Sequence, residues 1–173
     1  MKKITLDHIT KIEGHAKLHI KIKDNQLKKC RLEIFEGSRY FEGIVKGKHF
    51  SDLPDITSRI CGVCSVAHTL ASIKAIENAF KVKVSEQTRL LRELLIIGGI
   101  LQSHVLHLYF LVLPDYFDCN NALELAKKDP SLVKRALRIK RTCNHLVATL
   151  AARDVHPISA IPGGFTRLPE QSK

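Results

Sequence analysis

The chain has 173 residues, of which 45% are hydrophobic, and a formal net charge of +11. This length is enough for one domain with a hydrophobic core, and the composition argues against intrinsic disorder. The basic residues are spread along the sequence and aromatic residues make up only 6% of it, so nucleic-acid binding is not expected. The N-terminus lacks the apolar run of a secretory signal, and the five cysteines are irregularly spaced; both features favour free thiols in the cytoplasm over a disulfide framework.

The N-terminal part of the chain predicts a β hairpin. Residues 15–23 alternate between apolar and polar side chains, which indicates a half-buried strand. An Asp-Asn turn signal follows, and a second alternating run from Cys30 to Ile34 predicts the returning strand. Cys30 lies on the apolar face of that run and is expected to be a core thiol. Residues 36–60 contain three glycines and a proline and are predicted to be loop-rich.

The rest of the chain is dominated by helical patterns. Apolar residues at helical spacing predict four helices, over residues 64–80, 86–113, 119–128 and 131–153. Ser131 is the predicted N-cap of the last helix, and the segment from residue 155 onward is predicted to be extended loop. The expected fold class is therefore α+β and mainly α, with an N-terminal β hairpin followed by long packed helices.

Residues 94–113 are long and apolar enough to cross a bilayer. Polar residues lie in the middle of this segment, among them Gln102 and His104, and polar groups are costly in lipid. The segment is therefore predicted to be a buried helix of a larger assembly, and no transmembrane span is expected. Two further cysteines, Cys119 and Cys143, are interpreted as packing residues.

The stretch RICGVCSVAH, residues 59–68, carries the clearest chemical signal. It places two thiols three positions apart, Cys61 and Cys64, at the predicted start of a helix, where the helix dipole favours a thiolate. Thiolates are soft ligands that suit zinc, copper(I), nickel or iron. His68 follows Cys64 by four residues and therefore shares its helix face.

Several interpretations of this cysteine pair remain open from the residues alone. A zinc ribbon requires a second Cys/His pair, and the other cysteines occur singly. A thioredoxin-like redox pair is expected in a βαβ context, which the predicted elements do not provide. An inert structural pair also remains. The favoured interpretation is a metal site that is completed by ligands from outside this chain.

Four segments together resemble one known family: ITKIEGHAKLHI, SRYFEG, RICGVCSVAHTLAS and QSHVLHLYFL. They closely resemble the large subunit of nickel-iron hydrogenases, above all the cytoplasmic cofactor-coupled type that includes the sulfhydrogenase and F420-linked branches. The resemblance covers essentially the whole chain, and the motifs occur in family order. It implies that residues 1–173 form the N-terminal part of a single hydrogenase large-subunit domain.

The resemblance also implies the metals and the reaction. Cys61 corresponds to a terminal nickel thiolate, and Cys64 to a thiolate that bridges nickel and iron, where the iron also carries carbon monoxide and cyanide ligands. The implied reaction is the reversible heterolytic cleavage of H2 into protons and electrons. The implied partner is the hydrogenase small subunit, whose iron–sulfur clusters carry the electrons away.

Four more residues match positions of the family's motifs. Glu13 corresponds to a carboxylate that relays protons, and Glu42 to a ligand of a structural magnesium, although Tyr40 replaces the usual glycine of that motif. His68 matches a histidine that supports the metal ligands, and Arg59 is the arginine of the same cysteine motif. Without the resemblance, Glu13 and Glu42 would each be interpreted as surface carboxylates.

Part of the family's metal site is absent from this sequence. The family needs four cysteines, and the second pair lies in an Asp-Pro-Cys-x-x-Cys-type motif that this sequence lacks. The segment HPISAIPGGF resembles the family's mid-chain region. We therefore expect an N-terminal portion of a large subunit that requires the missing C-terminal half and is inactive alone. Two alternatives remain open: a non-catalytic relative such as the quinone-site subunit of complex I, and an independent zinc- or redox-binding module.

Overall fold

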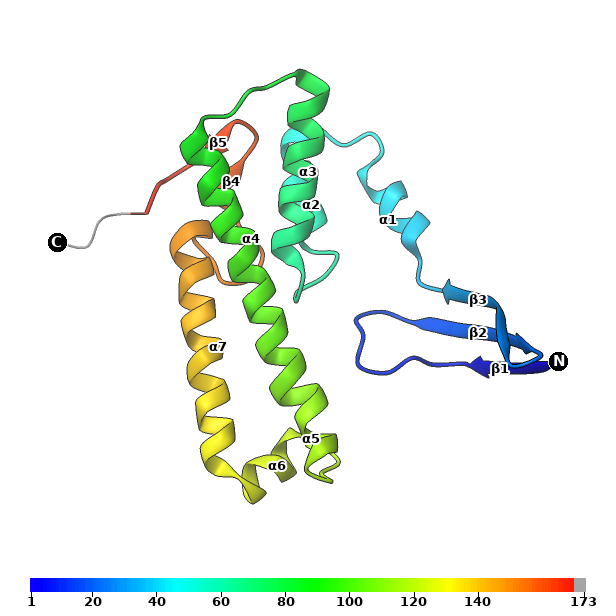
Figure 1. Cartoon of the computed structure of the whole chain (residues 1–173). Coiled ribbons are helices and arrows are strands. Elements are labelled where there is room, and N and C mark those ends of the chain that lie inside the picture. Colours follow the sequence, from blue (N-terminus) through cyan, green and yellow to red (C-terminus); the bar gives the residue numbers. More distant parts are fainter. Residues whose placement is uncertain (170–173) are drawn as a thin grey trace. The chain divides into compact units, whose positions relative to one another are not determined.

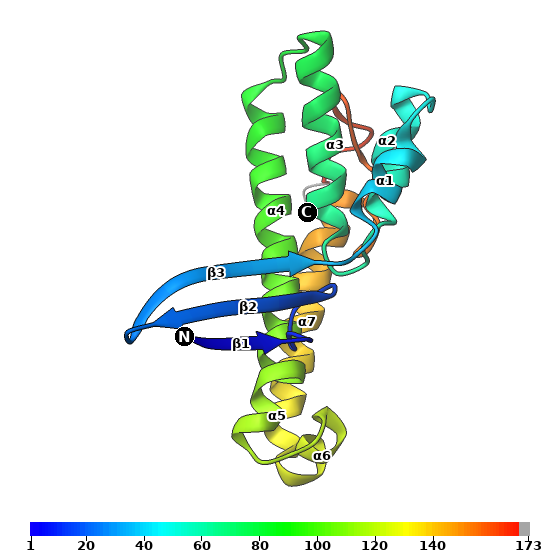
Figure 2. The same ribbon diagram turned by 90° about the vertical axis from the view of Figure 1, so that its right-hand side faces the viewer.

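The computed structural model describes residues 1–169 and divides the chain into two compact units, Met1–Gly43 and Ile44–Lys173. The first unit contains a three-stranded antiparallel sheet in the order β1-β2-β3, whose strands lie side by side in Figure 2. These strands are β1 (Lys2–Leu6), β2 (Ala16–Lys23) and β3 (Gln26–Ile34). The predicted hairpin is confirmed, and a third strand, β1, is added to it. Helix α1 (Ser38–Val45) follows the sheet.

The turn between β2 and β3 explains the register of the hairpin. Asp24 and Asn25 both have positive φ, 52° and 56°, as a two-residue turn of the type preferred in hairpins requires. They place Lys23 opposite Gln26. The prediction that Cys30 is a core thiol is wrong, because its side chain is exposed. Leu32 and Ile34 on the same face are 56% and 65% exposed, so the described residues of this unit do not cover that face of β3.

The second unit is helical (Figure 1). Its helices are the 3-10 helix η1 (Phe50–Asp52), α2 (Leu53–Ser58), α3 (Ser65–Phe80), α4 (Glu86–Leu106), the π-helix η2 (His107–Val112), α5 (Leu113–Tyr116), α6 (Ala122–Lys128) and α7 (Pro130–Ala151). A two-stranded hairpin, β4 (Ala160–Ile161) and β5 (Gly164–Phe165), follows α7. The four predicted helical segments and the mainly helical fold class are thus confirmed.

Three local predictions in the helical part are corrected. The region 36–60 contains α1, η1 and α2 rather than mainly loop, and the C-terminal segment forms the β4–β5 hairpin. The N-cap of α7 is Asp129 rather than Ser131, because the Asp129 carboxylate accepts a hydrogen bond from Leu132 N at 2.9 Å. Pro130 then occupies the first helical position, where its missing N–H costs nothing.

The core of the second unit lies between α3, α4 and α7. Leu95 of α4 and Ile73 of α3 are fully buried, together with Val147 of α7. Two adjacent glycines allow the helices to approach closely. A Cβ on Gly98 would lie 2.9 Å from Val147 Cγ2, and one on Gly99 would lie 3.1 Å from Val66 Cβ. The packing therefore fixes α4 against the first turn of α3, directly after the cysteine motif.

A buried ion pair ties the far end of α3 to the β4–β5 hairpin. Glu77 and Arg92 are 6% and 5% exposed, and the guanidinium donates to both carboxylate oxygens at 2.8 and 2.7 Å. Arg92 also donates to Ile161 O at 3.0 Å, and Gly163 N donates to Glu77 Oε1 at 2.7 Å. Burial by itself raises the pKa of Glu77. The hydrogen bonds from Arg92 and Gly163, together with the positive charges of Arg92 and Lys74, outweigh burial, so that the pKa lies below its ordinary value.

The helical run from α4 to α5 is long and apolar. Glu86–Tyr116 has the length and hydropathy of a membrane span, and 22% of its most apolar window is buried. One such helix is weak evidence, since core helices of soluble proteins meet the same criteria. The absence of a transmembrane span therefore stays a prediction. Apolar side chains at helical spacing on α4 remain exposed, namely Leu90, Leu94, Ile97 and Leu101.

Candidate metal centre

The cysteine motif forms a short loop between two helices. Residues 59–64 connect α2 to α3. Arg59 is the C-cap of α2, where its N–H bonds to Ile56 O at 3.2 Å, and its side chain is exposed. Cys64 is the N-cap of α3, as the sequence predicted. Both cysteines are partly buried and can therefore be reached from solvent.

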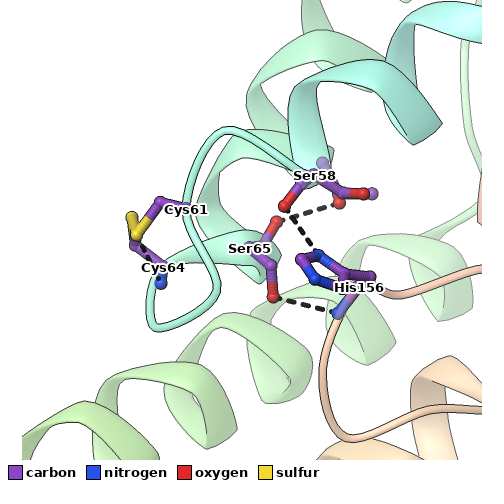
Figure 3. The surroundings of a disulfide bond; sticks show 6 residues. Ser58, Cys61, Cys64, Ser65 and His156 are labelled. Carbon is purple, nitrogen blue, oxygen red and sulfur yellow. Dashed lines mark hydrogen bonds between the residues drawn. A yellow bond between two sulfur atoms is a disulfide. The ribbon is translucent and has the colours of Figure 1, made fainter.

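The two cysteine sulfurs converge on one point. Cys61 and Cys64 form a disulfide, with 5.5 Å between their Cα atoms, a separation within the normal range for such a bond. The expectation of free thiols is therefore wrong for this pair, because the loop turns both side chains to the same side. The other three cysteines are free, and Cys119 and Cys143 are buried as predicted. Figure 3 shows the disulfide with Cys64 N, which donates to Cys61 Sγ at 3.2 Å.

This donor set fits half of a nickel–iron site. When reduced, two thiolates that already converge can bind one metal ion together, and sulfur suits nickel and iron. Backbone N–H donation to Cys61 Sγ is a further stabilising contact for a thiolate. Within residues 1–169 no group of three or more His, Cys, Asp or Glu side chains could hold a metal ion. The described residues therefore bring two sulfur donors together at this loop, and no third candidate ligand beside them.

His68 lies one helical turn after Cys64 on α3, half-buried. Its backbone carbonyl accepts a hydrogen bond from Thr57 Oγ1 of α2 at 3.3 Å, which holds the two helices together next to the loop. Among the described residues its ring makes no hydrogen bond to Cys64 Sγ. The supporting role predicted for the His68 side chain therefore stays a prediction.

A contact that the sequence did not predict joins the two ends of the cysteine loop, residues 59–64. His156, in the segment after α7, donates its backbone N–H to Ser65 Oγ at 3.2 Å, and its Nδ1 lies 2.9 Å from Ser58 O. Ser58 and Ser65 are 0% and 2% exposed, and they are the residues on either side of the cysteine loop. In Figure 3 the two sulfurs point away from this group. The HPISAIPGGF motif marked this segment in the sequence. The contacts themselves could not be predicted from a local pattern, because the bonded residues are separated by 91 and 98 positions.

The two predicted carboxylates belong to the first unit. Glu13 lies in the connection between β1 and β2 and is exposed; Gly14 beside it has a φ of 91°. This positive φ favours glycine, because residues with a Cβ rarely adopt it. Glu42 is exposed on α1. Arg59, Cys61, Cys64 and His68 all belong to the second unit.

The fold and the site define the class as a mainly helical protein with two convergent sulfurs at a helix N-terminus, a pair that could bind one metal ion together when reduced. Residues 39–135 match a family described as nickel-dependent hydrogenase, and residues 3–36 match one described as HoxL-like. The chain belongs to the nickel-dependent hydrogenase family, whose members are oxidoreductases acting on H2. The resemblance drawn from the motifs is thereby confirmed.

Individual relatives align with nearly the whole length of this chain. The alpha chain of sulfhydrogenase 2 from Pyrococcus furiosus is 41% identical over 170 residues, which are 98% of this chain and 41% of the relative. The vhu F420-non-reducing hydrogenase of Methanocaldococcus jannaschii has a subunit that is 36% identical over 182 aligned residues, which are 100% of this chain and 43% of the relative. The chain thus spans about two fifths of the length of the curated relatives it matches.

Solved structures give the same result for the fold. An NAD+-reducing NiFe-hydrogenase in the H2-reduced state matches with a TM-score of 0.77 and 29% identity, over 96% of this chain and 39% of that one. The reduced Ni-Fe-Se hydrogenase of D. vulgaris Hildenborough matches with a TM-score of 0.72 and 32% identity, over 97% and 38%. The fold is therefore that of the corresponding part of a hydrogenase large subunit.

Proposed function

We propose that this chain supplies half of the nickel–iron ligand set of a hydrogenase large subunit, for the reversible heterolytic cleavage of H2. The observation that carries the proposal is the convergence of the Cys61 and Cys64 sulfurs at the N-terminus of α3. Within the family motif we assign Cys61 as a terminal nickel ligand and Cys64 as the ligand shared by nickel and iron. The cofactor comprises nickel and an iron that carries carbon monoxide and cyanide.

The protein's own contribution at this site is to hold two thiolates in place. The metals, when bound, supply Lewis acidity toward hydrogen. The α3 N-terminus offers a positive dipole end to Cys64, and Cys64 N–H donates to Cys61 Sγ. Both interactions favour the deprotonated sulfur that a metal requires. The contact between Gly99 and Val66 fixes the helix on which this arrangement depends.

We assign proton transfer and magnesium binding to the carboxylates of the first unit. Glu13 is exposed, so that its carboxylate can exchange protons with neighbouring groups or water. Glu42 offers hard oxygen ligands of the kind that magnesium prefers. Tyr40, the residue that departs from the family motif, is 69% exposed.

The assembly that we propose has three parts. Residues 1–173 would act as the N-terminal part of one large-subunit domain, and a C-terminal half would supply the second pair of thiolates. A small subunit with iron–sulfur clusters would accept the electrons, while H2 and protons are the substrates. We propose a cytoplasmic location, in keeping with the cofactor-coupled hydrogenases that the motifs resemble.

Nickel binding by the purified, reduced 173-residue chain tests the proposal. Under anaerobic conditions we expect stoichiometric nickel with thiolate charge-transfer absorption, lost after the thiols are alkylated, and no hydrogen turnover, because the described residues bring only two thiolates together at this site. Stoichiometric zinc in the isolated folded chain would instead support a zinc module. A complex assembled without nickel would support a non-catalytic relative, and turnover by the chain alone would contradict the expected inactivity.

A further inference from the structure

We infer that His156 is a positioning residue that clamps the two ends of the cysteine loop and so sets the separation of the Cys61 and Cys64 sulfurs. The inference rests on the proposed function as far as the metal is concerned. The clamp itself is described by contacts within the second unit alone. Figure 3 shows its members, with dashed lines from His156 to Ser58 and to Ser65.

His156 uses two different atoms to contact two different helices. Its ring Nδ1 reaches the carbonyl of Ser58, the last residue of α2, at 2.9 Å. Its backbone N–H reaches Ser65 Oγ, on the first residue of α3, at 3.2 Å. Because a carbonyl can only accept, Nδ1 must carry the hydrogen in this contact. The bond is therefore available to the Nδ1–H tautomer and to the protonated ring alike.

The segment that presents His156 is itself held at both ends. Its two ends are bonded to each other: Ile158 N and Ser159 N donate to Ala151 O at 3.1 and 3.3 Å, and Ser159 Oγ donates to Leu150 O at 2.6 Å. Further along the chain, the buried Glu77–Arg92 pair binds Ile161 O and Gly163 N. His156 thus projects from a fixed support on the end of α7 toward the two ends of the cysteine loop, next to which Thr57 of α2 also bonds to His68 O of α3.

The backbone of His156 shows that the contact is maintained against a conformational cost. Its φ is 55°, in the left-handed region that residues other than glycine rarely adopt. Such a conformation persists only when the surrounding structure holds it there. The next residue, Pro157, is buried and has a fixed φ of its own. The strain lies at the residue that touches both loop ends, as expected of a positioning device.

The test compares His156→Gly with His156→Asn in the reduced full chain. Glycine keeps the backbone N–H and tolerates the positive φ, so it removes only the ring. Asparagine also tolerates this φ and restores an N–H donor at the position of Nδ1. The expected result for His156→Gly is a nickel affinity lower by about 10- to 100-fold, the usual effect of losing a group that orients a metal ligand. His156→Asn is expected to restore most of it, and His145→Ala, a change of an exposed histidine on α7, should have no effect.

A second readout does not depend on the metal. In a glutathione redox buffer, glutathione disulfide oxidises the Cys61 and Cys64 thiols to their disulfide and is reduced to two glutathione molecules. The equilibrium constant of this exchange reports how well the loop holds the two sulfurs together. We expect His156→Gly to lower it about fivefold, the equivalent of one lost hydrogen bond, and His156→Asn to restore it.

The two readouts separate the inference from the proposed function. The clamp is supported if His156→Gly lowers both the nickel affinity and the exchange constant and His156→Asn restores them. If the unaltered chain binds nickel and His156→Gly changes neither quantity, the clamp is wrong and the metal proposal stands. If the unaltered chain binds no nickel but the exchange constant falls as expected, the clamp stands and the metal proposal fails. No nickel binding together with an unchanged exchange constant rejects both.

Discussion

Replacing Cys64 by serine is expected to abolish nickel retention by the reduced chain, and metal incorporation in an assembled hydrogenase that contains it. A hydroxyl is a harder donor than a thiolate and remains protonated at neutral pH, so the replacement removes one of the two ligands that the described residues offer. Loss of a direct ligand should exceed the effect of losing a supporting group, and the affinity should fall by more than about 100-fold. Metal analysis after dialysis measures the nickel that the chain retains.

Cys30→Ser provides the matched control for this change. Cys30 is a free, exposed thiol on β3, and its replacement should leave the nickel content unchanged. The same measurement on Cys61→Ser should give the same loss as Cys64→Ser if both sulfurs bind one metal centre. Normal nickel content in Cys64→Ser would refute its assignment as the bridging ligand.

The second large effect is expected at the buried ion pair. Arg92→Ala leaves the Glu77 carboxylate buried with only the Gly163 N–H as a hydrogen-bond donor among the described residues. Breaking one partner of a buried pair costs about 3–5 kcal/mol in the free energy of unfolding, which chemical denaturation can measure. The β4–β5 hairpin should loosen as well, because Ile161 O loses its donor.

The pH dependence of this variant gives an independent check. In the unaltered chain the pKa of Glu77 is lowered from 4.5, so its contribution is present above pH 4.5 and is lost as the pH falls through the lowered pKa. Without Arg92, burial is the largest remaining influence and is expected to raise that pKa above 4.5. The raised pKa favours folding at acid pH and disfavours it as the pH rises. The loss in the free energy of unfolding caused by Arg92→Ala should therefore be smaller at about pH 4 than at neutral pH.

Two further variants separate the ion pair from general effects on α4. Arg89→Ala removes an exposed arginine of the same helix that pairs with Glu86 and Glu93; it should change stability little, because exposed pairs contribute little. The double change Glu77→Leu with Arg92→Met leaves no charge buried and should recover part of the loss. If Arg89→Ala lowers the free energy of unfolding as much as Arg92→Ala does, the buried pair stabilises the fold no more than the exposed pairs do, and the prediction is wrong.

Short-range patterns predicted most of the elements correctly. The alternation through residues 15–23 and the Asp24-Asn25 turn led to β2 and β3, and helical spacing led to α3, α4, α6 and α7. The short helices between residues 36 and 60 were missed because the three glycines and the proline of this region are typical of loops. The β1 strand and the β4–β5 hairpin depend on pairing with distant residues, which local patterns do not contain.

Burial was predicted less well than secondary structure. Val66, Leu70 and Ile73 of α3 are buried as their spacing indicated, but Cys30 and the exposed leucines and isoleucines of α4 are not. A pattern shows which face of an element is apolar, and it does not show whether another element lies on that face. The described residues cover one side of α4, where Gly98 and Gly99 permit close contact, and leave the other side open.

The amino-acid sequence by itself determined the family of this protein and the cysteine pair that we propose as metal ligands, since both rest on residue types at short spacing. Only the tertiary structure could decide how that pair is held. Ser58 and Ser65 are contacted by His156 from the far end of the chain, and Glu77 is neutralised by Arg92 from the next helix. Such contacts arise because chain folding brings distant residues together at fixed distances, and this information lies in the packing of α3, α4 and α7 rather than in any local pattern.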